Sequence, residues 1–140
     1  MRFYLRRYIA VVLLAIISAC VSIDGPAVRA KEFLTSIHTG KNMDPEEWLT
    51  REARAAPMFN AFGGLSLMVK QTSAWATKYG GLKSVDIVGI RREADKAVIT
   101  ANIILKQEYK NPNSPVASER EDKVWEVHLL VEDGKWKIAP

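Results

Sequence analysis

The hydrophobic period of the chain changes once, at Gly80-Gly81, and this change limits the fold more than any other feature. Before the two glycines, apolar residues recur at the three- and four-residue spacing of helices with one buried face. After them, apolar and polar residues alternate, as in the strands of a sheet that is buried on one side. Helices followed by strands are typical of the α+β class. We therefore predict an α+β fold in which N-terminal helices pack on a four-stranded antiparallel sheet.

Three helices are expected in the first half of the chain. The first starts at Pro26, a residue suited to the first helical position, and stops at Gly40. Asp44 can cap a short second helix that includes Trp48-Leu49, and a third helix is expected over residues 66–78. The expected buried positions are Ala30, Phe33, Leu34 and Ile37 in the first helix, and Leu65, Met68, Thr72, Trp75 and Tyr79 along the third.

Four strands are expected in the second half, over residues 85–92, 96–109, 118–132 and 135–139. Asp133-Gly134 is a strong signal for a tight hairpin, and the two prolines of Asn111–Pro115 indicate a loop between the second and third strands. The simplest connection is a meander with the helices over its apolar face. The inward-facing positions are Ala97, Ile99, Ala101, Ile103 and Leu105, then Trp125, Val127, Leu129 and Val131, then Trp136 and Ile138.

The N-terminus has the pattern of a secretory signal peptide. Met1–Arg7 is basic, Ile9–Ile17 is an apolar run of nine residues, and Ser18-Ala19 supplies small side chains before Cys20. The run is about half of the roughly 20 residues that span a bilayer, which disfavours the alternative of an uncleaved signal anchor. We therefore expect residues 1–19 to be removed.

Ile17-Ser18-Ala19-Cys20 resembles the lipobox of bacterial prolipoproteins, with Ile where Leu is commonest. The resemblance implies cleavage between Ala19 and Cys20, a diacylglycerol on the Cys20 thiol, and acylation, for example by palmitate, of the new amine. The alternative is a buried core thiol. By resemblance to enterobacterial lipoprotein sorting, in which Asp after the cysteine retains the protein in the inner membrane, Val21 favours the outer membrane, facing the periplasm, if the cell has two membranes. Residues 20–25 form a short tether, which would keep a single domain over residues 26–140 within ~17 Å of its envelope membrane.

Charge and residue counts narrow the classes of partner. Arg2, Arg6 and Arg7 lie in the leader, and removing them lowers the formal charge of +4 to +1. Such a balance disfavours nucleic acid as a partner. One cysteine allows no internal disulfide or cysteine cluster, and two histidines make a histidine-rich metal site improbable. We expect no metal and no cofactor.

The junction Tyr79–Val85 and the closing segment Glu132–Ile138 resemble small bacterial lipoproteins with a nuclear transport factor 2-like (NTF2-like, or cystatin-like) domain of unassigned function. The resemblance covers most of residues 25–140. It implies a cone in which a curved sheet wraps the first helix and leaves a pocket at its open end. Some relatives of this fold are isomerases or dehydratases with Asp and His in the pocket, and others are binding or dimerising modules, so the fold alone does not assign a function.

The two histidines have ordinary structural interpretations. His128 alternates with Glu126 on the face opposite Trp125 and Leu129, so it should point to solvent or to a partner. His38 lies near the end of the first helix, where a cation or a donor to the last carbonyl groups is common, and a ligand or base is the alternative.

Asp86 can lie in either of two strand registers. One register turns Val88 and Ile90 inward together with Asp86, and the other buries Val85 and Ile87. We favour the second, with a solvated Asp86, because a carboxylate inside an apolar cone needs a partner.

The apolar segment 55–64 is broken by a proline and two glycines and joins the second and third helices. It can be a loop over the core. Alternatively, Met58, Phe59 and Phe62 line the mouth of the pocket or form an adaptable apolar patch for a partner. The four tryptophans fall on predicted buried stripes, so we interpret them as core residues and not as a ligand-stacking set: Trp48, Trp75, Trp125 and Trp136.

The sequence contains no nucleophile elbow, phosphate loop or dinucleotide fingerprint. We therefore predict a non-catalytic lipoprotein that binds a protein partner or a second copy of itself near the membrane. The alternative is a pocket for a small apolar or lipidic ligand, with an isomerase- or dehydratase-like step as an extension.

Overall fold

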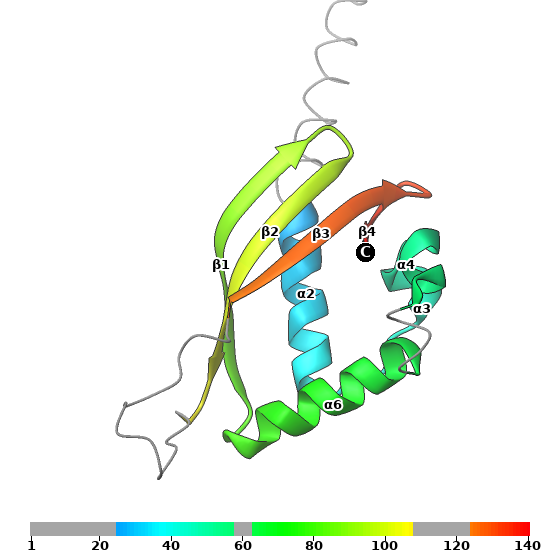
Figure 1. The fold of residues 1–140 in the computed structure, drawn as a ribbon. Helices are drawn as coiled ribbons and strands as arrows, with labels where there is room; N and C mark the ends of the chain where they lie inside the picture. Colours follow the sequence, from blue (N-terminus) through cyan, green and yellow to red (C-terminus); the bar gives the residue numbers. More distant parts are fainter. Residues whose placement is uncertain (1–24, 58–62, 108–123) are drawn as a thin grey trace, which may run out of the picture.

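Residues 25–57, 63–107 and 124–140, which are those that the computed structural model describes, form four helices and a single sheet (Figure 1). The elements are α2 (Gly25–Thr39), α3 (Pro45–Trp48), α4 (Arg51–Ala55), α6 (Gly64–Lys78), β1 (Leu82–Glu93), β2 (Lys96–Leu105), β3 (Val124–Glu132) and β4 (Lys135–Ile138).

The sheet is an open antiparallel meander in the order β1-β2-β3-β4, as the alternating pattern predicts. Asp133 and Gly134 both have positive φ, of 54° and 74°, which matches the tight hairpin expected between β3 and β4. The hairpin between β1 and β2 turns at Ala94-Asp95, where Ala94 has a φ of 45°. The predicted α+β fold is confirmed.

The core lies between α2 and the inner face of the curved sheet, and α6 crosses the C-terminal end of α2 (Figure 1). The apolar stripe expected on α2 is buried, and so are the inward positions of β2. Gly40, with a φ of 75°, ends α2 where expected, and the Lys41 N–H donates to the Ser36 carbonyl at 3.0 Å. The largest fully buried side chains include Leu34, Ile37, Leu49, Ile99, Ile103 and Leu129.

The segment that follows α2, over residues 44–55, differs from the prediction. Asp44 caps α3 by accepting from the Glu46 N–H at 3.1 Å, but Leu49 is extended and forms a parallel bridge with Ile138. A further helix, α4, follows, with Thr50 as its cap. Leu49 was therefore wrongly placed in a helix, because its backbone adds to the edge of β4.

The burial of α6 is rotated relative to the predicted stripe. Leu65, Val69 and Ala76 are fully buried, whereas Met68, Trp75 and Tyr79 pack at its margin. The strand ends differ as well. β2 stops at Leu105, β4 stops at Ile138, and residues 108–123, which include the expected Asn111–Pro115 loop and the start of the third strand, lie outside the described residues.

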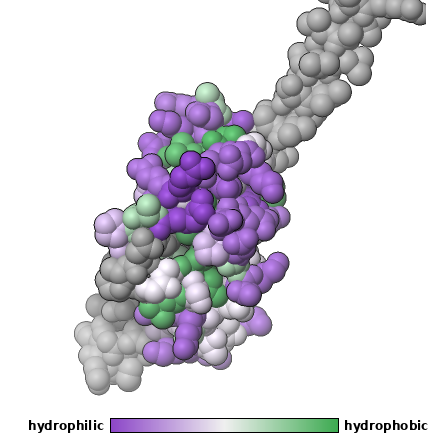
Figure 2. Space-filling view, turned by 90° about the vertical axis from the view of Figure 1, so that its right-hand side faces the viewer, coloured by the Kyte–Doolittle hydropathy of each residue, from purple (hydrophilic) through white to green (hydrophobic). Residues whose placement is uncertain are grey.

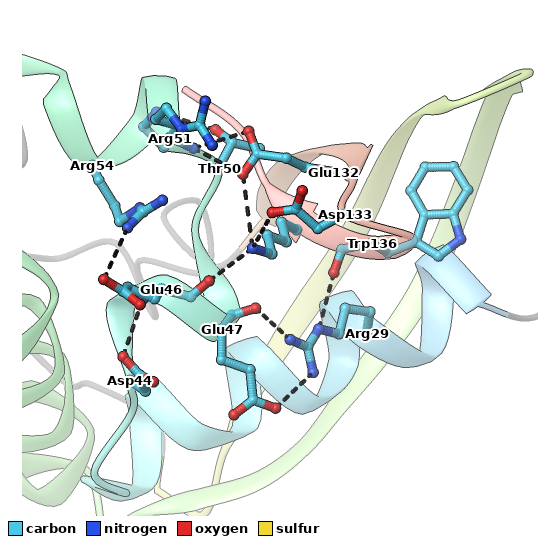
Figure 3. Close-up of polar contacts among 12 residues, drawn as sticks. Arg29, Asp44, Glu46, Glu47, Thr50, Arg51, Arg54, Glu132, Asp133 and Trp136 are labelled. Carbon is cyan, nitrogen blue, oxygen red and sulfur yellow. Dashed lines mark hydrogen bonds and ion pairs between the residues drawn. The ribbon is translucent and has the colours of Figure 1, made fainter.

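Two positions at the last hairpin depart from the alternation. Val131, expected inward, is 39% exposed, and Lys137, expected outward, is 6% exposed. Lys137 is buried because the α3–α4 segment covers it. Its Nζ donates to the Glu46 carbonyl at 2.8 Å and lies 3.7 Å from a Glu132 carboxylate oxygen and 3.8 Å from one of Asp133 (Figure 3).

The same network joins α2 to the α3–α4 segment (Figure 3). Arg29 donates to the carbonyls of Trp136 and Glu47, at 3.1 and 2.8 Å, and its guanidinium lies 3.6 Å from the centre of the Trp48 ring. Both Glu132 carboxylate oxygens accept from the Arg51 N–H at 3.1 Å, at the start of α4. The bonds to the Glu47 carbonyl and from the Arg51 N–H satisfy backbone groups of the short helices α3 and α4, which have few internal hydrogen bonds of their own.

Candidate functional site

The end of α2 that lies beside α6 holds a buried histidine between two tryptophans. His38, in the last turn of α2, is 2% exposed. The centre of its ring lies 5.2 Å from that of Trp125 on β3 and 6.1 Å from that of Trp75 on α6, both edge to face. Since His38 lies four residues after Leu34, the helix itself places the imidazole on the buried stripe.

The hydrogen bonding of His38 fixes its tautomer. Nδ1 lies 2.6 Å from the Leu34 carbonyl oxygen, which can only accept, so Nδ1 carries a proton and donates it. Nε2 is buried and has no hydrogen-bond partner among residues 25–57, 63–107 and 124–140. Burial lowers the pKa of His38 from its ordinary value of 6.5, and the bond to the Leu34 carbonyl opposes this only in part. The imidazole is therefore neutral near pH 7, and its Nε2 acceptor is unused within the described part of the chain.

A pocket of about 320 Å³ opens between α6 and β3, beside the two tryptophans that flank this histidine. It is lined by Gln71, Thr72, Trp75 and Trp125, so two indole rings face it together with an amide and a hydroxyl group. Its volume falls at the lower end of the roughly 300–1,000 Å³ of small-molecule pockets. The arrangement fits a small flat ligand that is mainly apolar and carries at least one polar group.

A hollow of about 290 Å³ on another side of α6 has a different character. Lys41, Met43, Ser66 and Lys70 are among its lining residues, and both lysines are exposed. Solvated lysines of this kind do not define a binding site. The pocket between the tryptophans is therefore the stronger candidate.

The candidate residues predicted from the sequence have different outcomes in the structure. Ala19, Cys20, Met58, Phe59 and Phe62 lie outside the described residues, so their roles stay predictions. His128 is exposed, as expected, with Nε2 2.7 Å from a Glu126 carboxylate oxygen.

Asp86 is solvated, as favoured, and the register of β1 explains why. Val85, opposite Ile103 of β2, is 2% exposed, whereas Val88 is 56% exposed after a bulge in β1. The register that turned Asp86 inward is therefore wrong.

The interpretation of the tryptophans needs a partial correction. All four are half-buried and pack against the core, but Trp75 and Trp125 also form walls of the pocket. Two ordinary roles were expected for His38, a donor to a helix carbonyl and a cation. It donates to the Leu34 carbonyl, but its lowered pKa contradicts the role of a cation. The available sequence signal for this site was a histidine on an apolar helical stripe.

Within the described part of the chain, no helix combines the length and hydrophobicity needed to cross a membrane. Among the same residues, no three histidine, cysteine or acidic side chains are grouped as a metal site.

No protein-family model matches the chain, and no curated protein sequence is similar to it at a significant level. Among solved structures, a candidate NTF2-like transpeptidase from Campylobacter jejuni superposes with a TM-score of 0.61 and 18% sequence identity, over 82% of this chain and 97% of its own. A de novo designed NTF2 fold protein, NT-9, aligns with a TM-score of 0.40 and 15% identity, over 78% of this chain and 77% of its own. The helices and the four-stranded antiparallel sheet of this chain therefore have the NTF2-like α+β fold.

Proposed function

We propose that this protein is a lipid-anchored domain of the bacterial envelope, held through Cys20, that binds a small flat ligand between Trp75 and Trp125. The observation that carries the binding role is the pocket of about 320 Å³ that Trp75 and Trp125 line together with Gln71 and Thr72. Stacking on aromatic faces gives affinity for a flat apolar group, and a few polar groups orient it. Gln71 and Thr72 are those groups at the mouth.

We propose binding without chemical conversion. A general base works best with a pKa near the operating pH, whereas burial makes His38 a weaker base than a free imidazole. Its Nδ1–H donates a hydrogen bond to a backbone carbonyl. This bond fixes the tautomer but does not add the negative charge that a carboxylate partner would supply. His38 is therefore poorly suited to removing a proton from a ligand.

The test fills the pocket without touching the core. Thr72 is half-buried at the pocket, and Ala74, two residues on, is exposed on the same helix. Thr72→Trp should occlude the pocket, while Ala74→Trp adds the same bulk outside it. The probes are indole and 2-naphthol, titrated by calorimetry into the purified chain and both variants.

We expect the wild type and Ala74→Trp to bind a probe with equal affinity, and Thr72→Trp to lose at least tenfold. Equal binding by all three chains, or none by the wild type at millimolar probe, would refute the pocket as the binding site. Circular dichroism of each variant verifies that the fold is retained.

A further inference from the structure

The end of the domain where α2 begins leaves apolar side chains uncovered. Ile90 lies opposite buried Ile99 on the helix-facing side of the sheet, yet it is 55% exposed. Val131, opposite Trp136, is 39% exposed on the same side. We call Ile90, Arg92, Val131 and Trp136 the anchor-end patch.

The patch combines a cation with an indole. The Arg92 guanidinium lies 5.2 Å from the centre of the Trp136 ring, and Trp136 is half-buried. Tryptophan is enriched where protein meets lipid headgroups, and arginine can lay its stem on apolar surface while its charge stays in the wet layer. Figure 2 shows one group of hydrophobic residues near the upper end of the face it presents and another in its lower half. The upper end is where Figure 1 places the start of α2 and the sheet hairpins.

The chain enters the domain at this patch. A Cβ added to Gly25 would lie 2.8 Å from the Trp136 Nε1, so the first residue of α2 is in contact with the indole. Cys20 is five residues earlier, and an extended chain of that length spans at most ~18 Å. Acyl chains on Cys20 would therefore keep the patch within reach of the headgroup layer, which is roughly 5–7 Å thick on each side of a bilayer.

The charges around the patch are mixed in sign, which indicates that contact with a membrane would not be electrostatic. Exposed cations and anions occur together on both hairpins: Arg91, Glu93, Asp95, Lys96, Asp133 and Lys135. Such a set gives no strong attraction to an anionic surface, so contact would depend on the apolar and aromatic groups and change little with salt.

We propose that the anchor-end patch packs against the lipid headgroups of the membrane that holds Cys20. This inference rests on the proposed lipid anchor. The domain then stands with its tryptophan pocket at the far end of α2, which is roughly 22 Å long, directed away from that membrane.

The experiment uses the full, lipidated protein in phosphatidylcholine vesicles. The sole native cysteine is Cys20, whose thiol is consumed by lipidation, so a nitroxide can be attached at one introduced cysteine. Ile90→Cys places it in the patch, and Val131→Cys places a second one there in case the first disturbs β1. Val124→Cys is the matched control, because Val124 is 60% exposed and starts β3 at the opposite end of that strand from Val131.

Flotation and the mass of the N-terminal peptide are measured first, and failure to float refutes the proposed anchor and this inference together. For floated protein, we expect labels at positions 90 and 131 to be at least threefold less accessible to a water-soluble nickel complex than the label at 124. We also expect the difference to persist between 50 mM and 500 mM NaCl. Equal accessibility at the three positions overturns the docking inference and leaves the anchor standing.

Discussion

A buried histidine is the most informative residue of the molecule, because its imidazole lacks a full set of partners among the residues that the structure describes. His38 occupies a helical stripe position that an apolar residue would fill without cost. A buried acceptor without a hydrogen bond costs roughly 1–3 kcal/mol relative to a satisfied one.

The lowered pKa of His38 predicts acid-sensitive stability. Below its ordinary value of 6.5 the unfolded chain binds a proton that the folded chain does not, so the free energy of unfolding falls as pH falls from 6.5 toward the folded pKa. A single such group changes that free energy by up to about 1.4 kcal/mol per pH unit. We expect urea unfolding to become easier between pH 7.5 and pH 5, and His38→Phe to reduce this dependence.

His128 provides the control for this experiment, since it is the other histidine and is half exposed. His128→Gln should retain the same fall in stability with acid. A pH profile that is unaltered in His38→Phe would mean that other groups cause the acid sensitivity.

Elements were predicted well where the chain repeats a pattern over several turns or strand pairs. α2, α6 and the four strands each show such a pattern. α4 was missed because five residues are too few to display a helical period. Burial of Lys137 and exposure of Val131 depend on which other elements cover the last hairpin, which the alternation within one strand cannot report.

The two hairpins allow a reciprocal prediction. Gly134 has a φ of 74° and open space where a Cβ would lie, so Gly134→Ala tests backbone strain alone. We expect a loss of about 1 kcal/mol in unfolding free energy. Ala94 already carries this strain at a φ of 45°, and Ala94→Gly should gain about 0.5 kcal/mol after the entropy of glycine is offset. Urea midpoints measure both, and changes of the same sign would contradict the assigned turn conformations.

At the scale of the whole molecule, the site could be predicted only in part. The sequence placed Trp75 and Trp125 on buried stripes, and both pack against the core. That the two lie on either side of His38 depends on α6 crossing the end of α2, a contact between segments about forty residues apart for which no local pattern exists. Met58, Phe59 and Phe62 stay a prediction for the pocket mouth or a partner surface, as do a protein partner and a homodimer.

The lipid anchor makes its own prediction at this scale. Cys20→Ser should keep the protein out of the membrane fraction and abolish incorporation of labelled palmitate, because two or three acyl chains supply the binding energy. Position 20 precedes the described residues of the domain, so we expect the thermal midpoint of the purified chain to be unchanged. A Cys20→Ser chain that still sediments with membranes would refute anchoring through this thiol.

The separation of Gly25 and His38 at opposite ends of α2 has a practical consequence for biochemistry. A stiff rod of four turns divides the part of the protein that would be attached from the part that would recognise a ligand. Ligand affinities measured on a water-soluble Cys20→Ser chain should thus equal those of the acylated form in vesicles. Inhibitors of membrane attachment and inhibitors of ligand binding can be sought separately.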